Sequence, residues 1–160
     1  MTALPSDRIA RINRRQLLKS GITGTILISA GPIAYAQVRS HDLSLERRKR
    51  FGSAPVRQGR VTLTLPPIAE NGYSVPLSVT VDSPMTQDDH VTRIAIFSPR
   101  NPVAHIASFH LGPLSGPAHI STRIRLGGTQ TLQAIAEMSD GTLWSGSMET
   151  VVTLAACIVL

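Results

Sequence analysis

The sequence predicts an all-β fold: an immunoglobulin-like two-sheet sandwich of about seven strands, preceded by a short helix and an N-terminal signal peptide. Short runs of alternating apolar and polar residues follow one another from residue 60 onward. Turn-forming residues, mainly Gly, Pro and Asp, separate these runs. No long helical pattern follows Phe51, and this combination is typical of two packed β-sheets.

The 160 residues, of which 42% are hydrophobic, suit one globular domain. We expect four segments: a signal peptide at residues 1–36, a helical lead-in and linker at 37–59, the sandwich at 60–154 and a C-terminal cysteine arm at 155–160. The net charge of +6 comes from the first two segments, because the chain from Val61 onward has four basic and seven acidic residues. A mildly acidic sandwich argues against a nucleic-acid partner.

The first segment has the features of a twin-arginine export signal. Arg14 and Arg15 precede a moderately apolar, glycine-rich stretch that ends at the small residues Ala34 and Ala36. This order predicts cleavage after Ala36 and export of the folded protein to the periplasm. A membrane anchor is the alternative, but the stretch contains Pro32 and is short for a hydrocarbon core of about 30 Å. We therefore expect no stable membrane anchor.

Residues 42–52 predict one short helix, which Asp42 caps at its start and Gly52 ends. The basic run from Arg47 to Arg50 is expected to be a solvated face of this helix and not a binding motif. Residues 53–59, which contain Pro55, are expected to form a linker.

The expected strands lie at residues 61–65, 75–81, 91–97, 103–111, 119–126, 129–138 and from 142 into the tail. Alternation is clear in the first of them, where threonines separate Val61, Leu63 and Leu65. Pro76 suggests an edge position or a bulge for the second strand, and Asp140-Gly141 predicts a hairpin turn. Because the chain has one cysteine, apolar packing and not an internal disulfide must hold the sheets together.

The last ten residues, 151–160, form an apolar run that contains the only cysteine, Cys157. One interpretation is a final strand in which Cys157 is a small buried hydrophobic residue. The other is a functional thiol, because an exported protein meets an oxidising compartment and this cysteine has no partner within its own chain.

Four stretches of the predicted sandwich resemble one family of proteins. They lie at residues 65–76, 82–89, 121–126 and 134–141, and their most specific parts are Ala-Glu-Asn-Gly at 69–72 and Ser-Pro-Met-Thr at 83–86. Together they resemble SoxY, the sulfur-carrier subunit of the periplasmic thiosulfate-oxidising (Sox) system, over roughly residues 60–157. The twin-arginine signal is also where this resemblance implies one.

The resemblance implies a covalent carrier, not an enzyme, with no cofactor of its own. In this family a Gly-Gly-Cys-Gly-Gly arm follows the final strand, and its cysteine holds the sulfur intermediates. A c-type cytochrome couples thiosulfate to the thiol, a dimanganese hydrolase removes sulfate, and in some organisms a molybdenum-containing sulfane dehydrogenase oxidises the remaining sulfur. The stable partner is SoxZ, a second sandwich subunit. The resemblance thus implies a heterodimer that contacts these enzymes transiently.

The arm of this chain departs from the family pattern. Cys157 aligns with the carrier cysteine, but Ala155, Ala156, Ile158 and Val159 stand where the family has glycines. Side chains at these positions restrict the backbone, and the β-branched ones favour continued strand. No basic residue lies near Cys157 in the sequence to promote the reactive thiolate. Two hypotheses follow: a sulfur carrier that uses Cys157, or a non-carrier binding or scaffold subunit of a Sox-type complex whose arm has lost carriage.

No other set of residues predicts a catalytic or metal site. His90, His105, His110 and His119 lack the spacing of zinc ligands, although the last three are expected on neighbouring strands. We interpret them as surface or hydrogen-bonded histidines. We expect neither a metal site nor an independent enzymatic activity.

Overall fold

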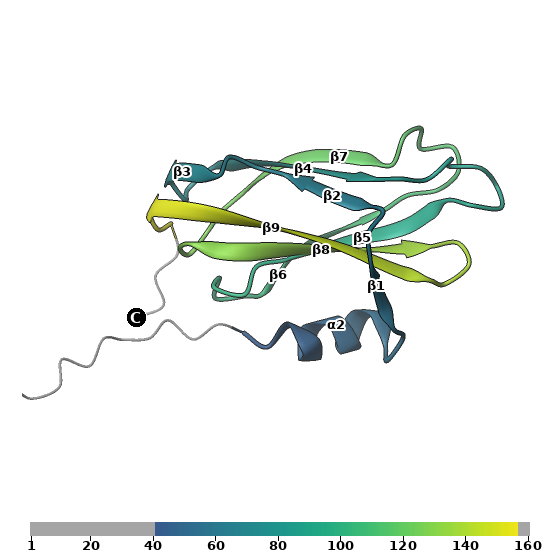
Figure 1. Cartoon of the computed structure of the whole chain (residues 1–160), viewed down its shortest axis with the longest axis horizontal. Coiled ribbons are helices and arrows are strands. Elements are labelled where there is room, and N and C mark those ends of the chain that lie inside the picture. The colour runs from purple at the N-terminus through teal and green to yellow at the C-terminus, as the bar shows by residue number, and fades with distance from the viewer. Residues whose placement is uncertain (1–40, 157–160) are drawn as a thin grey trace, which may run out of the picture. The chain divides into compact units, whose positions relative to one another are not determined.

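Two β-sheets packed face to face form the part of the chain that this computed structural model describes, residues 41–156 (Figure 1). The predicted sandwich with one preceding helix is thereby confirmed. The described residues form the seven expected strands and two short additional ones, β1 and β3. The elements are α2 (Leu43–Phe51), β1 (Val56–Gln58), β2 (Val61–Thr64), β3 (Ile68–Asn71), β4 (Val75–Val81), β5 (Val91–Phe97), β6 (His105–His110), β7 (His119–Ile124), β8 (Gln130–Met138) and β9 (Leu143–Leu154).

The strand β9 joins the first and last parts of the sandwich. The larger sheet has the strand order β1-β9-β8-β5-β6, with β3 also paired to β9, and the smaller sheet has the order β2-β4-β7. Along one edge, β9 pairs antiparallel with β8, from Leu143 opposite Glu137 to Thr150 opposite Gln130. Its other edge pairs in parallel with β1 at residues 143–145 and with β3 at residues 151–154. β8 therefore pairs with β9 as far as Thr150, and β3 continues the pairing on the other edge to Leu154.

The segment from β1 to β3 passes from one sheet to the other and back. β2 belongs to the smaller sheet, where Val61 lies opposite Val81, whereas β1 and β3 belong to the larger sheet. The β2 backbone approaches β9 so closely that a Cβ atom on Gly146 would lie 2.0 Å from the carbonyl oxygen of Val61. The approach of the two backbones therefore requires glycine at residue 146.

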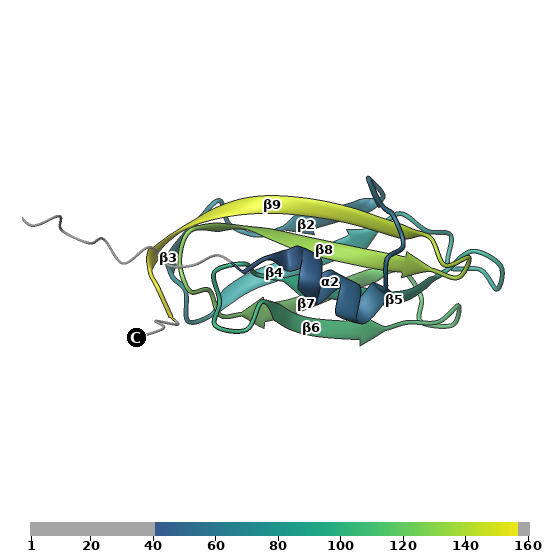
Figure 2. The same ribbon diagram turned by 90° about the horizontal axis from the view of Figure 1, so that it is seen from below.

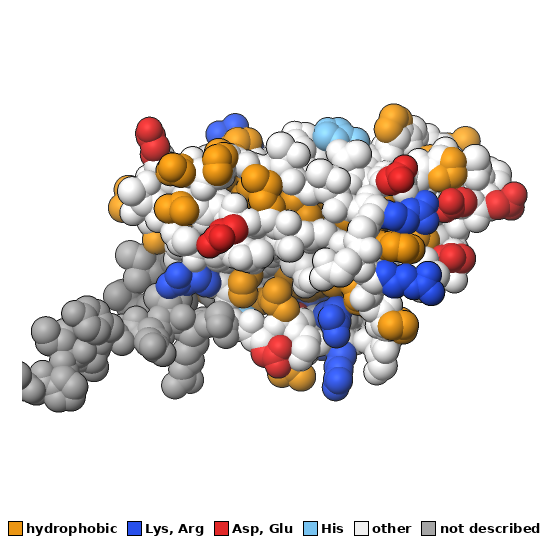
Figure 3. Space-filling model, viewed as in Figure 1, with side chains coloured by type: hydrophobic (Ala, Val, Ile, Leu, Met, Phe, Trp, Pro, Cys, Tyr) orange, Lys and Arg blue, Asp and Glu red, His pale blue; other side chains and the backbone are white. Residues whose placement is uncertain are grey.

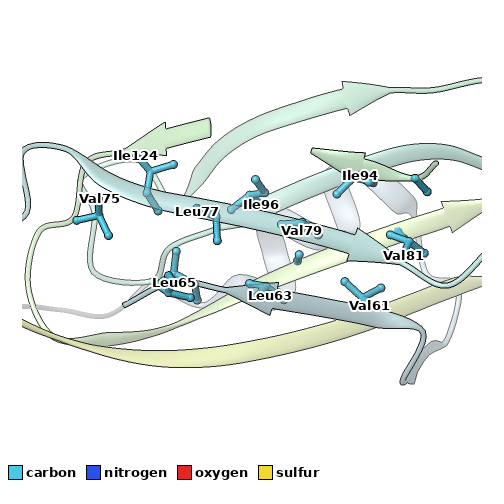
Figure 4. Close-up of a cluster of buried hydrophobic side chains, with 14 of the residues drawn as sticks. Val61, Leu63, Leu65, Val75, Leu77, Val79, Val81, Ile94, Ile96 and Ile124 are labelled. Carbon is cyan, nitrogen blue, oxygen red and sulfur yellow. The ribbon is translucent and has the colours of Figure 1, made fainter. Parts of the chain in front are cut away.

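The main hydrophobic core lies between the sheets. β2 buries every second side chain, as the period of a half-buried strand requires, and β4 buries alternate residues throughout. Leu63 of β2, Val79 of β4 and Ile94 of β5 belong to this one buried cluster (Figure 4). Their packing takes the place of the inter-sheet disulfide found in antibody domains.

The helix α2 covers part of the outer face of the larger sheet (Figure 2). Its residues Leu43 and Phe51 pack on a second, smaller apolar cluster that consists of Ala95, Phe97, Ile135 and Leu143. The larger sheet is thus buried on both faces at this point. This explains why β5 and β8 have long buried runs in place of strict alternation.

The helix begins and ends where the sequence predicts. The Asp42 carboxylate accepts a hydrogen bond from the Ser44 N–H at 2.9 Å, and this bond lowers the pKa of the Asp42 carboxyl. Gly52 is the C-terminal cap. Within the basic run, Arg50 pairs with Glu46 one helical turn away at 2.7 Å. No helix within residues 41–156 is both long enough and apolar enough to cross a membrane.

The segment at residues 53–59 differs from the expected linker because it contains β1. Residues 68–71 likewise form β3, although turn residues flank them on both sides. Pairing with β9 stabilises both strands, and that partner lies far away in the sequence. Pro76 does have the suggested edge position: β2 pairs with β4 only as far as Ser78, so Pro76 pairs only with β7.

Replacing Gly146 with alanine is expected to destabilise the sandwich by about 3 kcal/mol, because the new methyl group meets the backbone carbonyl of Val61. Urea unfolding measures this change in the free energy of unfolding. Gly112→Ala is the matched control, since a Cβ there meets nothing within 4 Å. We expect the control to change stability by less than about 0.5 kcal/mol. Equal destabilisation of the two variants would contradict the close approach of β2 to β9.

Candidate functional site

The cysteine arm leaves the sandwich at the end of β9. The strand ends at Leu154, and Ala155 and Ala156 follow as half-buried residues outside regular secondary structure. The other predicted arm residues and the export-signal residues lie outside the described part of the chain: Cys157, Ile158, Val159, Arg14, Arg15, Ala34 and Ala36.

Backbone hydrogen bonds hold the base of the arm against the sandwich. The Ala156 N–H donates to the carbonyl oxygen of Leu126 at 3.0 Å. Gly72 lies between these segments: its N–H donates to the Leu154 carbonyl at 2.7 Å, and its carbonyl accepts from the Leu126 N–H at 2.9 Å. The base of the arm is therefore bound to two connections, the one between β3 and β4 and the one between β7 and β8.

Gly72 allows these backbones to approach one another. It is buried, and a Cβ atom on it would lie 2.3 Å from the Leu126 carbonyl oxygen and 3.0 Å from the Ala156 nitrogen. Both neighbours are backbone atoms, so a side chain at residue 72 would push the segments apart. Gly72 is the last residue of the Ala-Glu-Asn-Gly stretch. Sequence reasoning did not connect this stretch with the arm, because the two are far apart along the chain.

One buried asparagine fixes the backbone on both sides of Leu126. Asn101 donates from Nδ2 to the Arg125 carbonyl at 2.8 Å and accepts at Oδ1 from the Gly127 N–H at 2.8 Å. The Leu126 side chain is itself fully buried in the main core. Buried amides with satisfied hydrogen bonds make the surrounding backbone rigid. The carbonyl that accepts from Ala156 is therefore a fixed part of the sandwich.

Exposed apolar side chains surround the base of the arm. Ile68 of β3 lies opposite Val151 of β9, Leu154 ends β9, and Tyr73 follows Gly72. We call Ile68, Tyr73, Val151 and Leu154 the apolar collar; each is between 46% and 64% exposed. Figure 3 shows hydrophobic side chains gathered over β3 and the end of β9. Such a concentration is typical of a surface that binds another protein.

A depression of about 250 Å³ lies beside the collar. Its walls are β3 and the start of β4, at the point where β2 no longer pairs with β4. Ile68 belongs to both the depression and the collar, and Glu70 contributes one acidic group. The end of the sandwich thus offers a partner a recess and apolar surface next to the arm.

Two arginines lie at the end of β7, in the segment that leads to Leu126. Arg123 donates from Nε to the Ser74 hydroxyl at 2.6 Å and from Nη2 to the Ser74 carbonyl at 3.0 Å. Arg125 immediately precedes Leu126, which bonds to Ala156. Sequence reasoning missed both arginines because the arm has no basic neighbour along the chain. The alternation of charged and apolar residues at 119–126 was visible, but its position beside the arm was not.

The four histidines considered above are not gathered into one site. Within residues 41–156, no three His, Cys, Asp or Glu side chains lie close enough together to hold a metal ion. Burial, and then the nearby Arg50 guanidinium, lower the pKa of His105, whose ring packs near Phe97. Three of the histidines have separate hydrogen-bond partners: His90 with the Thr86 carbonyl, His105 with Ser108 and His119 with Thr80.

Comparison with known proteins identifies one protein family. A family model described as "Sulfur oxidation protein SoxY" matches residues 47–157, a match that ends at Cys157. The solved structure of the sulfur carrier protein SoxY from Chlorobium limicola f. thiosulfatophilum is similar with a TM-score of 0.60 and 31% identity, over 70% of this chain and 96% of that chain. No match was found among the curated proteins.

A superoxide reductase (neelaredoxin) from Ignicoccus hospitalis is similar at a TM-score of 0.52 and 15% identity, over 59% of this chain and 80% of that chain. This likeness shows a shared sandwich fold and nothing more. The SoxY match, in contrast, includes most of α2, both sheets and the base of the arm. The chain therefore belongs to the SoxY family of sulfur oxidation proteins.

Proposed function

We propose that this protein holds sulfur intermediates of thiosulfate oxidation covalently on Cys157 and presents them to Sox enzymes in the periplasm. The observation that carries the proposal is the family match, which runs through the base of the arm and ends on Cys157. The similar protein from Chlorobium limicola is a sulfur carrier protein. Cys157 is the only thiol of this chain. The twin-arginine signal with Arg14 and Arg15 would direct the protein to the periplasm.

Holding sulfur covalently on the protein requires one thiol, and coupling thiosulfate to that thiol requires an electron acceptor. Joining thiosulfate to Cys157 forms a sulfur–sulfur bond, releases the thiol proton and passes two electrons to a c-type cytochrome. Water, in a dimanganese hydrolase, then removes the terminal sulfonate group as sulfate and leaves a persulfide on Cys157. A sulfane dehydrogenase oxidises that remaining sulfur. The carrier supplies no catalytic group in this scheme; it supplies the nucleophile, which reacts as the thiolate.

Charge at the end of β7 supports carriage. Arg123 and Arg125 lie beside Leu126, whose carbonyl bonds to Ala156. Positive charge close to a thiol favours its thiolate form and attracts anionic sulfur groups bound to it, and this is the role that the proposal gives to these arginines.

A SoxZ-type subunit is the stable partner in this proposal, and the Sox enzymes bind transiently. We assign the enzymes to the apolar collar, because its exposed side chains surround the base of the arm. Such a surface is typical of a site that binds another protein.

The bond between Ala156 and Leu126 also favours a second candidate, a binding or scaffold subunit of a Sox-type complex without carriage. A thiol held continuously against the sandwich would deliver nothing to an enzyme. Alkylation of Cys157 in the native complex separates the two candidates. Labelling only after unfolding supports the scaffold, and ready labelling of the native complex supports the carrier.

Incubating the reduced protein and its SoxZ-type partner with thiosulfate and the cytochrome is expected to add one thiosulfonate group to Cys157. Intact mass spectrometry detects the added mass, and a reductant should remove it because the link is a sulfur–sulfur bond. Cys157→Ser is the control and should remain unmodified. An unchanged wild-type mass, under conditions that load a SoxY protein with a glycine-flanked cysteine, would rule out carriage.

Replacing Ala155, Ala156, Ile158 and Val159 together with glycine is expected to speed loading several-fold, because these side chains restrict the backbone of the arm. Initial rates of adduct formation are compared at equal protein and enzyme concentrations. Glycine keeps every backbone N–H, so this variant changes stiffness without removing a hydrogen-bond donor. Equal rates for the two proteins would show that stiffness of the arm does not limit loading.

Ile68→Glu is expected to lower kcat/KM for loading about tenfold, because it places a charge in the centre of an apolar contact. Leu114→Glu is the matched control: Leu114 is 94% exposed and lies outside the collar, in the connection between β6 and β7. Thermal unfolding of both variants checks that each remains folded. Equal loss of kcat/KM in both variants would contradict docking at the collar.

A further inference from the structure

We infer that the edge of β3 that faces away from β9 binds an extended segment of a partner protein as an additional strand, with a basic side chain of that segment beside Glu70. The inference goes beyond the proposed function, because strand binding at this edge needs neither Cys157 nor sulfur. It rests on the unpaired backbone groups of β3, on the depression next to them and on the charge of Glu70.

The edge of β3 away from β9 has unpaired backbone groups. The Pro67 carbonyl accepts from the Val151 N–H at 2.9 Å, and in a parallel ladder this bond determines which residues of β3 bond to β9. Ala69 directs its backbone groups toward β9, whereas Ile68 and Glu70 direct theirs away from it. No described backbone group outside β9 bonds to these groups of Ile68 and Glu70. Two N–H donors and two carbonyl acceptors therefore face outward.

The depression lies along this edge and gives access to it. Ile68 and Glu70 line one side of the depression, and Pro76 of β4 lines the other. The pairing of β2 with β4 ends at Ser78, so the edge of β4 is open here as well. Proline has no N–H, however, so β4 offers no donor at residue 76. The edge of β3 supplies both donors and acceptors, and an added strand therefore pairs with β3.

The two faces of β3 determine the chemistry of the segment that fits. Ala69 is buried between the sheets, whereas Ile68 is 64% exposed and Glu70 is also exposed. Side chains at paired positions of neighbouring strands point to the same face, so an added strand continues both faces. Its inward side chains meet the apolar lining to which Pro66 and Val75 contribute. The segment therefore alternates inward apolar residues with outward polar ones, of which one is a Lys or Arg beside Glu70.

Glu70 determines which extended segments bind. An open sheet edge can pair with almost any strand, and charged side chains on an edge strand are a common protection against such pairing. β3 has four residues, and Glu70 is one of the two that direct their backbone groups outward. An acidic segment is repelled by this carboxylate, whereas a basic one pairs with it. Charge complementarity therefore selects the partner segment.

The synthetic hexapeptide acetyl-Thr-Val-Lys-Val-Thr-Val-amide is a probe with this alternation. In amide NMR spectra of the isotope-labelled protein, we expect saturable shifts at Ile68 and Glu70 as the peptide is added. The matched control is the same peptide with every backbone nitrogen methylated, which keeps the side chains but cannot donate. We expect the control to bind at least about tenfold more weakly, because it loses two hydrogen bonds.

Exchanging the charges tests the role of Glu70. The peptide with Glu in place of Lys is expected to bind the wild-type protein about three- to tenfold more weakly than the original peptide. Glu70→Lys should reverse this preference, so that the Glu peptide binds the variant more tightly than the Lys peptide. Glu149→Lys is the matched control, because Glu149 is exposed on β9 outside the depression and its replacement changes the net charge equally. It should retain the wild-type preference.

Amide hydrogen exchange checks the geometry of the edge. In the free protein the amides of Ile68 and Glu70 should exchange faster than that of Ala69, and the Lys peptide should slow both of them. The absence of saturable shifts at millimolar peptide would overturn the inference, and so would equal binding of the methylated peptide. An unchanged preference in Glu70→Lys would overturn the selection by charge. A protein that binds the peptide but does not load thiosulfate would refute carriage and retain strand binding, whereas loading without peptide binding would do the opposite.

Discussion

Backbone pairing along β9 is the constraint on which the rest of the structure depends. This strand has twelve residues, and β8 occupies one of its edges while β1 and β3 share the other. Between those two, β2 crosses over Gly146 to join the smaller sheet. The N-terminal strands therefore cannot change position without disturbing β9. Because β3 pairs with β9 as far as Leu154, the arm starts from a hydrogen-bonded strand end.

The sequence predicted the strands that bury one face, because burial on one side imposes a period of two on residues such as Leu63, Val79 and Val81. It did not predict β1 and β3, which have three and four residues and depend on a partner far along the chain. The apolar collar was equally hidden, since nothing in the sequence shows that Ile68 and Val151 lie opposite each other and exposed. The hydrogen bonds at the base of the arm join backbone groups, and their one trace in the sequence is the glycine at residue 72.

The departure of this arm from the family's glycines leaves the hydrogen bond at its base unchanged. This bond from Ala156 uses the backbone N–H, so alanine and glycine at this position form it equally well. The two residues differ when the bond is broken, because glycine then has more conformations to gain. Each alanine in place of glycine reduces that gain by about 0.4–1 kcal/mol. Ala155 and Ala156 therefore favour the bonded state through the lower entropy of the unbonded one.

The apolar collar and the depression beside it lie at the end of the sandwich from which the arm starts. The collar offers four exposed apolar residues beside a depression of about 250 Å³, far less surface than a permanent interface buries. A contact of this size suits partners that bind and are released in turn, as the proposed exchange between Sox enzymes would require. In that proposal the affinity for the enzymes comes from the surface around Ile68 and Leu154, where the arm starts.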